Sequence, residues 1–182
     1  MGFAIFLWSS SMGANSNEGV TGPNRLRNNP AVTIYKANDK NVLEYAEGKL
    51  FAPVAQGSEE SASIRFFEEN KGAFRMTDPA SELRLKRTQS DDLGMKHLRF
   101  EQYYNGLRVI GGELVTHFTE DGILKTVNGN FEPEINIGTS PSIQDQEAIQ
   151  AAQRDLESFF GKGNPGQAEL VVFPWEGNYF LA

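Results

Sequence analysis

The sequence contains no cysteine and only two histidines, His97 and His117. The lack of cysteine excludes a disulfide framework, a thiol nucleophile, a cysteine-ligated zinc ion and an iron–sulfur cluster. Basic residues are also few. The 17 Lys and Arg stand against 24 Asp and Glu, and the net charge of −7 argues against nucleic-acid binding. No apolar run approaches the roughly 18 residues of a membrane-spanning helix. We therefore expect neither a nucleic-acid partner nor a membrane span.

The chain does contain enough apolar material for a packed core. It has 182 residues, of which 39% are hydrophobic and 13 are Phe. This length predicts one domain or two small ones, at roughly 100–200 residues per domain. Residues 1–30 differ from the rest, because a short apolar run from Phe3 to Trp8 precedes small residues and an irregular stretch. A signal-peptide remnant and a disordered terminus with a linker both remain open for this segment.

The apolar pattern predicts an α+β fold, with a mainly antiparallel sheet covered by a few helices. Strand-like alternation occurs in the ranges 31–35, 83–88, 98–104, 107–110, 113–118, 123–127, 169–173 and 178–182. Helical spacing occurs over 58–71, capped by Ser58 and ended by Gly72, and over 142–160, capped by Ser142. The second helix has an apolar stripe formed by Ile149, Ala152, Leu156, Phe159 and Phe160. Because a helix followed by hairpins occurs twice, we expect two small units.

Three glycine-containing pairs indicate how the strands turn. Asn105-Gly106 favours a type I′ hairpin turn, since both residue types tolerate positive φ. Gly111-Gly112 lies inside a strand pattern and indicates a bulge or a close backbone approach. Asn128-Gly129 is expected to end the strand that begins near Ile123.

Residues with catalytic potential are sparse. The sequence has no His-Glu-x-x-His, Gly-x-Ser-x-Gly or phosphate-binding glycine motif. Glu113 and His117 would share one face of a strand, so a metal site formed with His97 is conceivable. Two histidines hydrogen-bonded on a sheet are the favoured interpretation, and we predict no catalytic residue and no metal ligand. Trp175 follows Pro174 in a loop, where an exposed Trp would be a candidate anchor for a protein partner.

One long run is more specific than these patterns. Residues 97–113 read His-Leu-Arg-Phe-Glu-Gln-Tyr-Tyr-Asn-Gly-Leu-Arg-Val-Ile-Gly-Gly-Glu, and His117-Phe118, Asp121-Gly122 and Val127-Asn128-Gly129 follow in order. The run resembles the N-terminal propeptide of thermolysin-like (M4) and fungalysin metallopeptidases. That family's pattern is roughly His-Val-Arg-aromatic-x-Gln-x-Tyr-x-Gly-aliphatic-Pro-Val-aliphatic-Gly-Gly-Glu. Here Arg108 stands where the family usually has Pro, and Glu101 stands where Gln is common.

The resemblance covers about residues 60–182 and implies an arrangement of two units. An FTP-like propeptide unit is expected over residues 31–138. A PepSY-like unit is expected over residues 139–182, because the Ala-rich helix and the strand after it fit the family order. The resemblance also implies that this second unit is incomplete at its C-terminus.

The resemblance further implies a function. The chain would be the propeptide of a secreted thermolysin-like zinc metallopeptidase, acting as an intramolecular chaperone and as an inhibitor of the catalytic domain. It would not itself be an enzyme, and its partner would be the cognate catalytic domain. It would be exported, secreted or periplasmic, as part of a precursor. No cofactor is expected in this chain, since zinc and calcium would belong to the parent catalytic domain. The alternative is a freestanding PepSY-type binding module that regulates a protease or an envelope partner.

We expect the centre of the motif to hold a bulged hairpin that presents a partner-binding surface. Its residues are Arg99, Gln102, Tyr104, Gly106, Gly111, Gly112 and Glu113, supported by His117. For the glycines, turn and bulge geometry is the favoured explanation. Arg99 and Gln102 could either pair within the sheet or face the partner.

Overall fold

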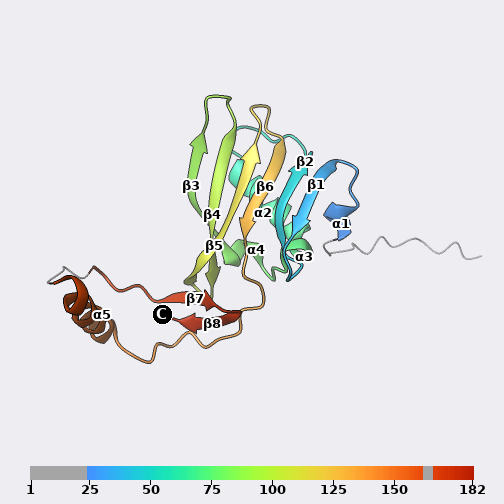
Figure 1. Ribbon diagram of the computed structural model, residues 1–182. Coiled ribbons are helices and arrows are strands. Elements are labelled where there is room, and N and C mark those ends of the chain that lie inside the picture. The colour runs from blue at the N-terminus through green and yellow to red at the C-terminus, as the bar shows by residue number, and fades with distance from the viewer. Residues whose placement is uncertain (1–23, 162–165) are drawn as a thin grey trace, which may run out of the picture.

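The computed structural model describes residues 24–161 and 166–182 and shows helices packed on one eight-stranded sheet (Figure 1). The helices are α1 (Asn24–Arg27), α2 (Glu59–Glu69), α3 (Lys71–Phe74), α4 (Pro79–Glu82) and α5 (Asp145–Phe160). The strands are β1 (Val32–Ala37), β2 (Leu43–Gly48), β3 (Leu83–Ser90), β4 (Lys96–Tyr104), β5 (Leu107–Phe118), β6 (Leu124–Asn130), β7 (Val171–Trp175) and β8 (Asn178–Leu181). The predicted α+β class is confirmed. The signal-peptide question concerns residues 1–23, which lie outside the described part of the chain.

Six strands form the main body of the sheet, in the order β1-β2-β6-β5-β4-β3, with every neighbouring pair antiparallel. The hairpin of β7 and β8 joins this sheet through a short parallel pairing of β7 with β5. The expected arrangement of two units, each with its own sheet, is therefore not confirmed. A domain boundary near residue 138 stays a prediction.

The core lies between the helices and one face of the sheet, where α2, α3 and α4 lie behind the strands in Figure 1. Phe67 is the centre of an aromatic cluster, with edge-to-face contacts to Phe66, Phe74 and Phe100. On β4 the core side chains Leu98 and Phe100 alternate with partly exposed residues. Burying large aromatic side chains in such contacts is a main source of stability for a core of this kind.

Two polar contacts fix α2 on the sheet. The hydroxyls of Ser63 and Thr116 are both buried and lie 2.8 Å apart, which joins the middle of α2 to β5. Lys96 Nζ lies 2.5 Å from the carboxylate of Glu59, which joins the start of α2 to the start of β4. The helix thus has one register on the sheet, because a shift would leave these buried groups without partners.

The helix ends differ from the prediction in three respects. The Ser58 side chain makes no capping hydrogen bond, and Gly72 lies inside α3, which ends at Arg75 in a left-handed conformation with φ 57°. Helix α5 begins at Asp145, where the Glu147 carboxylate accepts the backbone N–H of Gln144, and not after Ser142 as we expected. Within the predicted stripe, Ile149 is half-buried and Leu156 is exposed. The side chains of Phe159 and Phe160 lie outside the described set.

The predicted strands are confirmed, but two boundaries were wrong. Strand β7 continues to Trp175, where we expected the strand to end at Phe173. Asn128-Gly129 does not end β6, which continues to Asn130. Gly129 lies so close to β5 that an added Cβ would be 2.1 Å from the Glu113 carbonyl oxygen. The glycine therefore permits close strand pairing. Strand β2 was not predicted, because residues 36–57 show no clear period.

Candidate partner-binding site

Strand β5 changes its partner at Gly111 and Gly112. Beyond the glycines, residues 113–118 pair with β6, whereas Arg108 and Val109 pair with β7. The β4–β5 register shifts between Glu101 and Tyr103, and Gly111 has φ 79°. The predicted bulge is thus confirmed, and it directs the first part of β5 toward the C-terminal hairpin.

Arg108, the departure from the family's Pro, strengthens this second pairing. Its guanidinium forms a bidentate ion pair with Glu169, with Nε–Oε1 3.1 Å and Nη2–Oε2 2.7 Å. The hydrogen bonds and charge of Arg108 hold the pKa of the Glu169 carboxyl below its usual value, against a smaller opposing effect of burial. Arg108 therefore ties β5 to the segment that enters β7.

Gln102 is a buried polar side chain beside the bulge, with 2% exposure. Its amide binds the backbone of Glu132 in the connection after β6, donating from Nε2 and accepting at Oε1. Gly112 leaves room for this amide, since an added Cβ would lie 2.5 Å from Gln102 Oε1. Gln102 and Gly112 thus form one structural unit.

Two tyrosine side chains also hydrogen-bond the connection after β6. Tyr104 Oη donates to the Ile137 carbonyl at 3.1 Å, and Tyr179 Oη donates to the Pro133 carbonyl at 2.8 Å. Burial, together with the nearby Glu132 carboxylate, raises the pKa of Tyr179 to about 12, so its hydroxyl stays a donor at neutral pH. The connection is therefore anchored by β4 on one side and by β8 on the other.

The hairpin turn between β4 and β5 has the predicted conformation. Asn105 and Gly106 have φ 48° and 86°, as a type I′ turn requires. Nothing lies within 4 Å of an added Cβ at Gly106 or Gly111, so crowding does not explain these glycines. Glycine is favoured there because both residues have positive φ.

Arg99 and Glu113 lie on the face of the sheet that points away from the core. In Figure 1 no described helix covers that face. Arg99 Nη1 lies 2.5 Å from Glu113 Oε2, and Lys86 Nζ lies 3.0 Å from Glu113 Oε1 and 2.8 Å from Glu101. Burial raises the pKa of Glu113, but the bonds from Lys86 and Arg99 outweigh it and hold that pKa below its usual value. The cluster spans β3, β4 and β5.

His117 and His97 are direct cross-strand neighbours on the same face. Their Nδ1 atoms lie 2.7 Å apart, while His97 Nε2 faces Asp91 at 3.1 Å and His117 Nε2 faces Asn128 at 2.6 Å. Burial, aided by the charges of His97 and Arg99, lowers the pKa of His117 below its usual value, against the effect of the Asn128 hydrogen bond. Glu113 does not join the pair, because its carboxylate is held by Lys86 and Arg99.

The exposed aromatic side chains gather on the β7–β8 hairpin. Phe173 and Trp175 stack at a centroid distance of 6.0 Å, and Phe180 lies opposite Phe173 in the ladder. Trp175 is 57% exposed and Phe180 is 48% exposed. We call Phe173, Trp175 and Phe180 the aromatic patch. The expectation that Trp175 resists burial is confirmed, although it ends a strand rather than lying in a loop.

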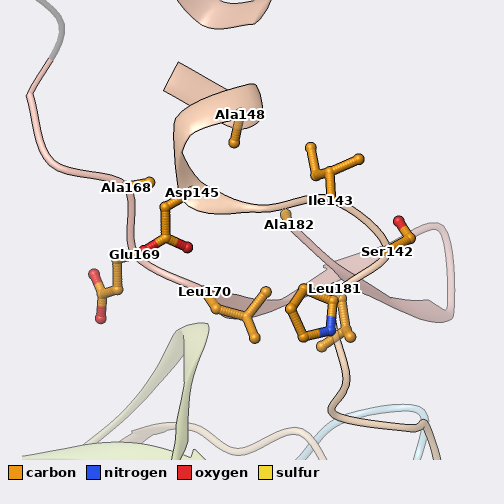
Figure 2. A pocket seen from close by; sticks show the side chains of 10 residues that line it. Ser142, Ile143, Asp145, Ala148, Ala168, Glu169, Leu170, Leu181 and Ala182 are labelled. Atoms are coloured by element: carbon orange, nitrogen blue, oxygen red, sulfur yellow. The ribbon is translucent and has the colours of Figure 1, made fainter. Parts of the chain in front are cut away.

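Two cavities lie near the connection and the hairpin. A cavity of about 160 Å³ separates the start of α5 from β7 and β8, and Figure 2 shows Ile143, Leu170 and Leu181 around it, with the carboxylates of Asp145 and Glu169 to one side. A more polar cavity of about 280 Å³ is lined by α4, Gln102, Tyr104 and the connection.

The described part of the chain contains no group of three or more His, Asp or Glu side chains that could together hold a metal ion. Its helices include none that is both long and apolar enough to cross a membrane.

Comparison with known proteins places this site in a recognised motif. Residues 81–131 match the Fungalysin/Thermolysin Propeptide Motif, FTP. The match begins in α4 and runs through β3, β4, β5 and β6, so it contains both the bulge and the histidine pair. It supports a propeptide of a thermolysin-like (M4) metallopeptidase.

Curated relatives agree with that class. The chain is 32% identical to thermolysin of Alicyclobacillus acidocaldarius subsp. acidocaldarius over 124 residues, covering 63% of the chain and 22% of the relative. It is 27% identical to neutral protease B of Bacillus subtilis (strain 168) over 138 residues, covering 71% and 26%. Bacillolysin of Bacillus subtilis subsp. amylosacchariticus is 26% identical over 159 residues, covering 81% and 29%. The chain thus spans less than a third of these relatives' length.

The structure brings most of the predicted motif residues to one region, but on two faces. Gln102 belongs to the buried side, whereas Arg99, Glu113 and His117 lie on the face without helices. Sequence reasoning missed Glu132 and Tyr179, which complete the anchoring of the connection. Residues 130–141 have no periodicity, so the sequence offered no signal for Glu132.

Proposed function

We propose that this chain is the propeptide of a secreted thermolysin-like zinc metallopeptidase, and that it acts as an intramolecular chaperone and inhibitor of the catalytic domain. One observation carries the proposal: the propeptide motif spans β3 to β6, the central strands of the sheet, which share one buried core with the helices. In this proposal the chain is not an enzyme. The catalytic zinc and any calcium belong to the parent domain, and the precursor is exported before maturation.

A chaperone of this type needs a folded surface ready before the catalytic domain folds. Large enzymes expose hydrophobic surface in folding intermediates, and a preformed template that binds such surface lowers the barrier to the native state. The sheet described above does not require the catalytic domain for its core, since its large aromatic side chains are already buried. It therefore suits a folding template.

The proposed contact surface is the aromatic patch. Trp and Phe anchors with exposed faces on a rigid hairpin match the residues that dominate binding energy in protein interfaces. The β7–β8 hairpin is attached to β5 by the β5–β7 strand pairing and by the Arg108–Glu169 ion pair. The aromatic anchors are therefore positioned before binding. The net charge of −7 adds long-range steering toward a basic surface on the partner.

A refolding assay tests the proposal. The unfolded catalytic domain of the parent peptidase is diluted with or without an equimolar amount of this chain, and recovered peptidase activity is followed. We expect faster recovery with the chain, followed by inhibition that rises saturably as more chain is added to the folded enzyme. Unchanged recovery together with no binding by titration would overturn the proposal and favour the freestanding binding module.

A further inference from the structure

The two histidines of the chain form an unusual contact. His97 and His117 are opposite each other on β4 and β5, their ring centroids are 4.9 Å apart, and their Nδ1 atoms face each other at 2.7 Å. The contact lies outside the aromatic patch, and the proposed function does not use it.

The outer nitrogen of each ring has an oxygen partner. His97 Nε2 faces a carboxylate oxygen of Asp91, and His117 Nε2 faces the amide oxygen of Asn128. Both oxygens only accept hydrogen bonds, so each Nε2 carries a hydrogen. A neutral imidazole with its hydrogen on Nε2 has a lone pair on Nδ1, and two such lone pairs then point at each other. A cation between them removes that repulsion.

The surrounding groups hold this orientation. Asp91 Oδ1 accepts the backbone N–H groups of Leu93 and Met95 at 2.9 and 3.0 Å, which fixes the carboxylate that orients His97. Histidines that ligate metals almost always donate their other ring N–H to a carboxylate or carbonyl oxygen, which fixes the tautomer. Both rings therefore already have the outer hydrogen bonds that metal ligands need.

The space and charge around the pair also permit a metal ion. Imidazole nitrogens bind zinc at about 2.0–2.1 Å, so a tetrahedral ion needs the two Nδ1 atoms roughly 3.3 Å apart. The two Nδ1 atoms, 2.7 Å apart without an ion, therefore have to separate by about 0.6 Å to accept one. His97 is 27% exposed, so water can occupy the remaining positions. Asp91 is the charged group in contact with the pair, 3.1 Å from His97 Nε2, and Arg99 on the same face is paired with Glu113.

We propose that His97 and His117 form a two-imidazole binding site for a divalent transition-metal ion of the zinc type, with Nδ1 of each ring as ligand and Asp91 and Asn128 as positioning residues. This differs from the expectation of a chain without metal ligands. The ion is separate from any catalytic zinc, because only two protein ligands are present and no general base lies beside them. Its role is to join β4 to β5 beside the Arg99–Glu113 cluster.

The test uses the chain without an affinity tag, since these are its only histidines. Zn²⁺ and Co²⁺ are titrated at pH 7.5 by calorimetry, and the Co²⁺ complex is examined by X-ray absorption for the number of imidazole ligands. We expect one ion per chain, two imidazoles per ion, and a thermal midpoint that rises with Zn²⁺ concentration. His117→Gln should weaken binding at least tenfold, and Asp91→Asn should weaken it by a smaller factor.

Gln89→Ala, on exposed β3 opposite His97, is the matched control and should bind as the parent chain does. Circular dichroism shows whether His117→Gln remains folded. The X-ray absorption measurement on the parent chain does not depend on that variant. The absence of saturable one-to-one binding, or a bound ion without imidazole ligands, would overturn the proposal and leave a shared proton as the cation between the rings.

Discussion

The side chain of Gln102 hydrogen-bonds both backbone groups of Glu132, a residue 30 positions later in the chain: Nε2 donates to the carbonyl oxygen at 2.7 Å, and Oε1 accepts the N–H at 2.9 Å. The side-chain amide thus satisfies both backbone groups of Glu132, as a neighbouring strand would. Together with Tyr104 and Tyr179, this side chain of the propeptide motif anchors the connection from β6 toward the C-terminal hairpin.

Replacing Gln102 should therefore destabilise the whole chain. In Gln102→Leu both backbone groups of Glu132 lose their partner at a partly buried position, which should cost about 2–4 kcal/mol of unfolding free energy. Urea denaturation followed by circular dichroism measures it. The exposed Gln89→Ala should change stability by less than about 0.5 kcal/mol. A Gln102→Leu chain as stable as the parent would show that the connection is not anchored here.

Gln102→Glu separates hydrogen bonding from shape. At neutral pH an ionised carboxylate accepts the N–H of Glu132 but repels its carbonyl oxygen, and its charge is buried, so the variant should be less stable than the parent. Below pH 4 the protonated carboxyl can again both donate and accept. The stability gap between the variant and the parent should narrow as the pH falls, and a gap independent of pH would contradict the assignment.

Gly112→Ala should disrupt the same unit from the opposite side. The new Cβ would lie 2.5 Å from Oε1 and 2.7 Å from Cβ of Gln102, so the buried amide has to move. We expect a loss of about 1–3 kcal/mol, as for other overpacked cores. Gly138→Ala is the control, because nothing lies within 4 Å of its added Cβ. The double variant Gly112→Ala/Gln102→Ala should lose less than the sum of the two single changes.

The Arg99–Glu113 cluster should contribute to stability in a pH-dependent way. The pKa of Glu113 is lowered from 4.5 in the folded chain, so its ionised form is favoured by folding. Its stabilisation is present above pH 4.5 and is lost as the pH falls through the lower, folded-state pKa. Glu113→Gln should remove about 1 kcal/mol at most at pH 7, since the pair is partly exposed.

Urea titrations of Glu113→Gln and the parent chain at a series of pH values measure this effect. The two stabilities should converge on acidification from pH 6 to below 4. Glu120→Gln, an exposed position in the turn before β6, should follow the parent throughout. A constant difference between Glu113→Gln and the parent would show that Glu113 acts through packing and not through charge.

The aromatic patch should matter for binding and not for stability. Trp175 is 57% exposed, so Trp175→Ala should leave the thermal midpoint within about 2 °C while weakening inhibition of the partner catalytic domain at least tenfold. Leu93→Ala, at a 79% exposed position far along the β3–β4 turn, is the control and should inhibit as the parent does. If Trp175→Ala and Leu93→Ala both inhibit as strongly as the parent chain, the contact surface is not the aromatic patch but the other face of the sheet.

Local signals predicted most of the secondary structure. Asn105-Gly106 specified its turn because positive φ at both positions is a property of the residues themselves. The alternation of Leu98, Phe100 and Gln102 correctly placed these side chains on one face of β4. The helix start predicted at Ser142 and the helix end predicted at Gly72 were wrong, because capping depends on which side chain reaches the free backbone groups.

The candidate site was predicted only in part. The motif named Gln102, Tyr104 and Gly112, but it did not show that they anchor the connection after β6. Their partners, Glu132 and Ile137, lie in a segment without periodicity. The 2.7 Å approach of His97 to His117 depends on the β4–β5 register, which a three-residue shift at the bulge determines.

The sequence by itself determined the α+β class, the order of strands in the central meander, and the glycines at its turns and bulge, since each follows from short-range periodicity and allowed φ values. Only the tertiary structure decided that β7 joins β5 in the same sheet, that Gln102 faces inward onto Glu132, and that the two histidines meet. Those outcomes depend on contacts between segments 20 to 63 residues apart, and they come from the packing of one core rather than from local preference.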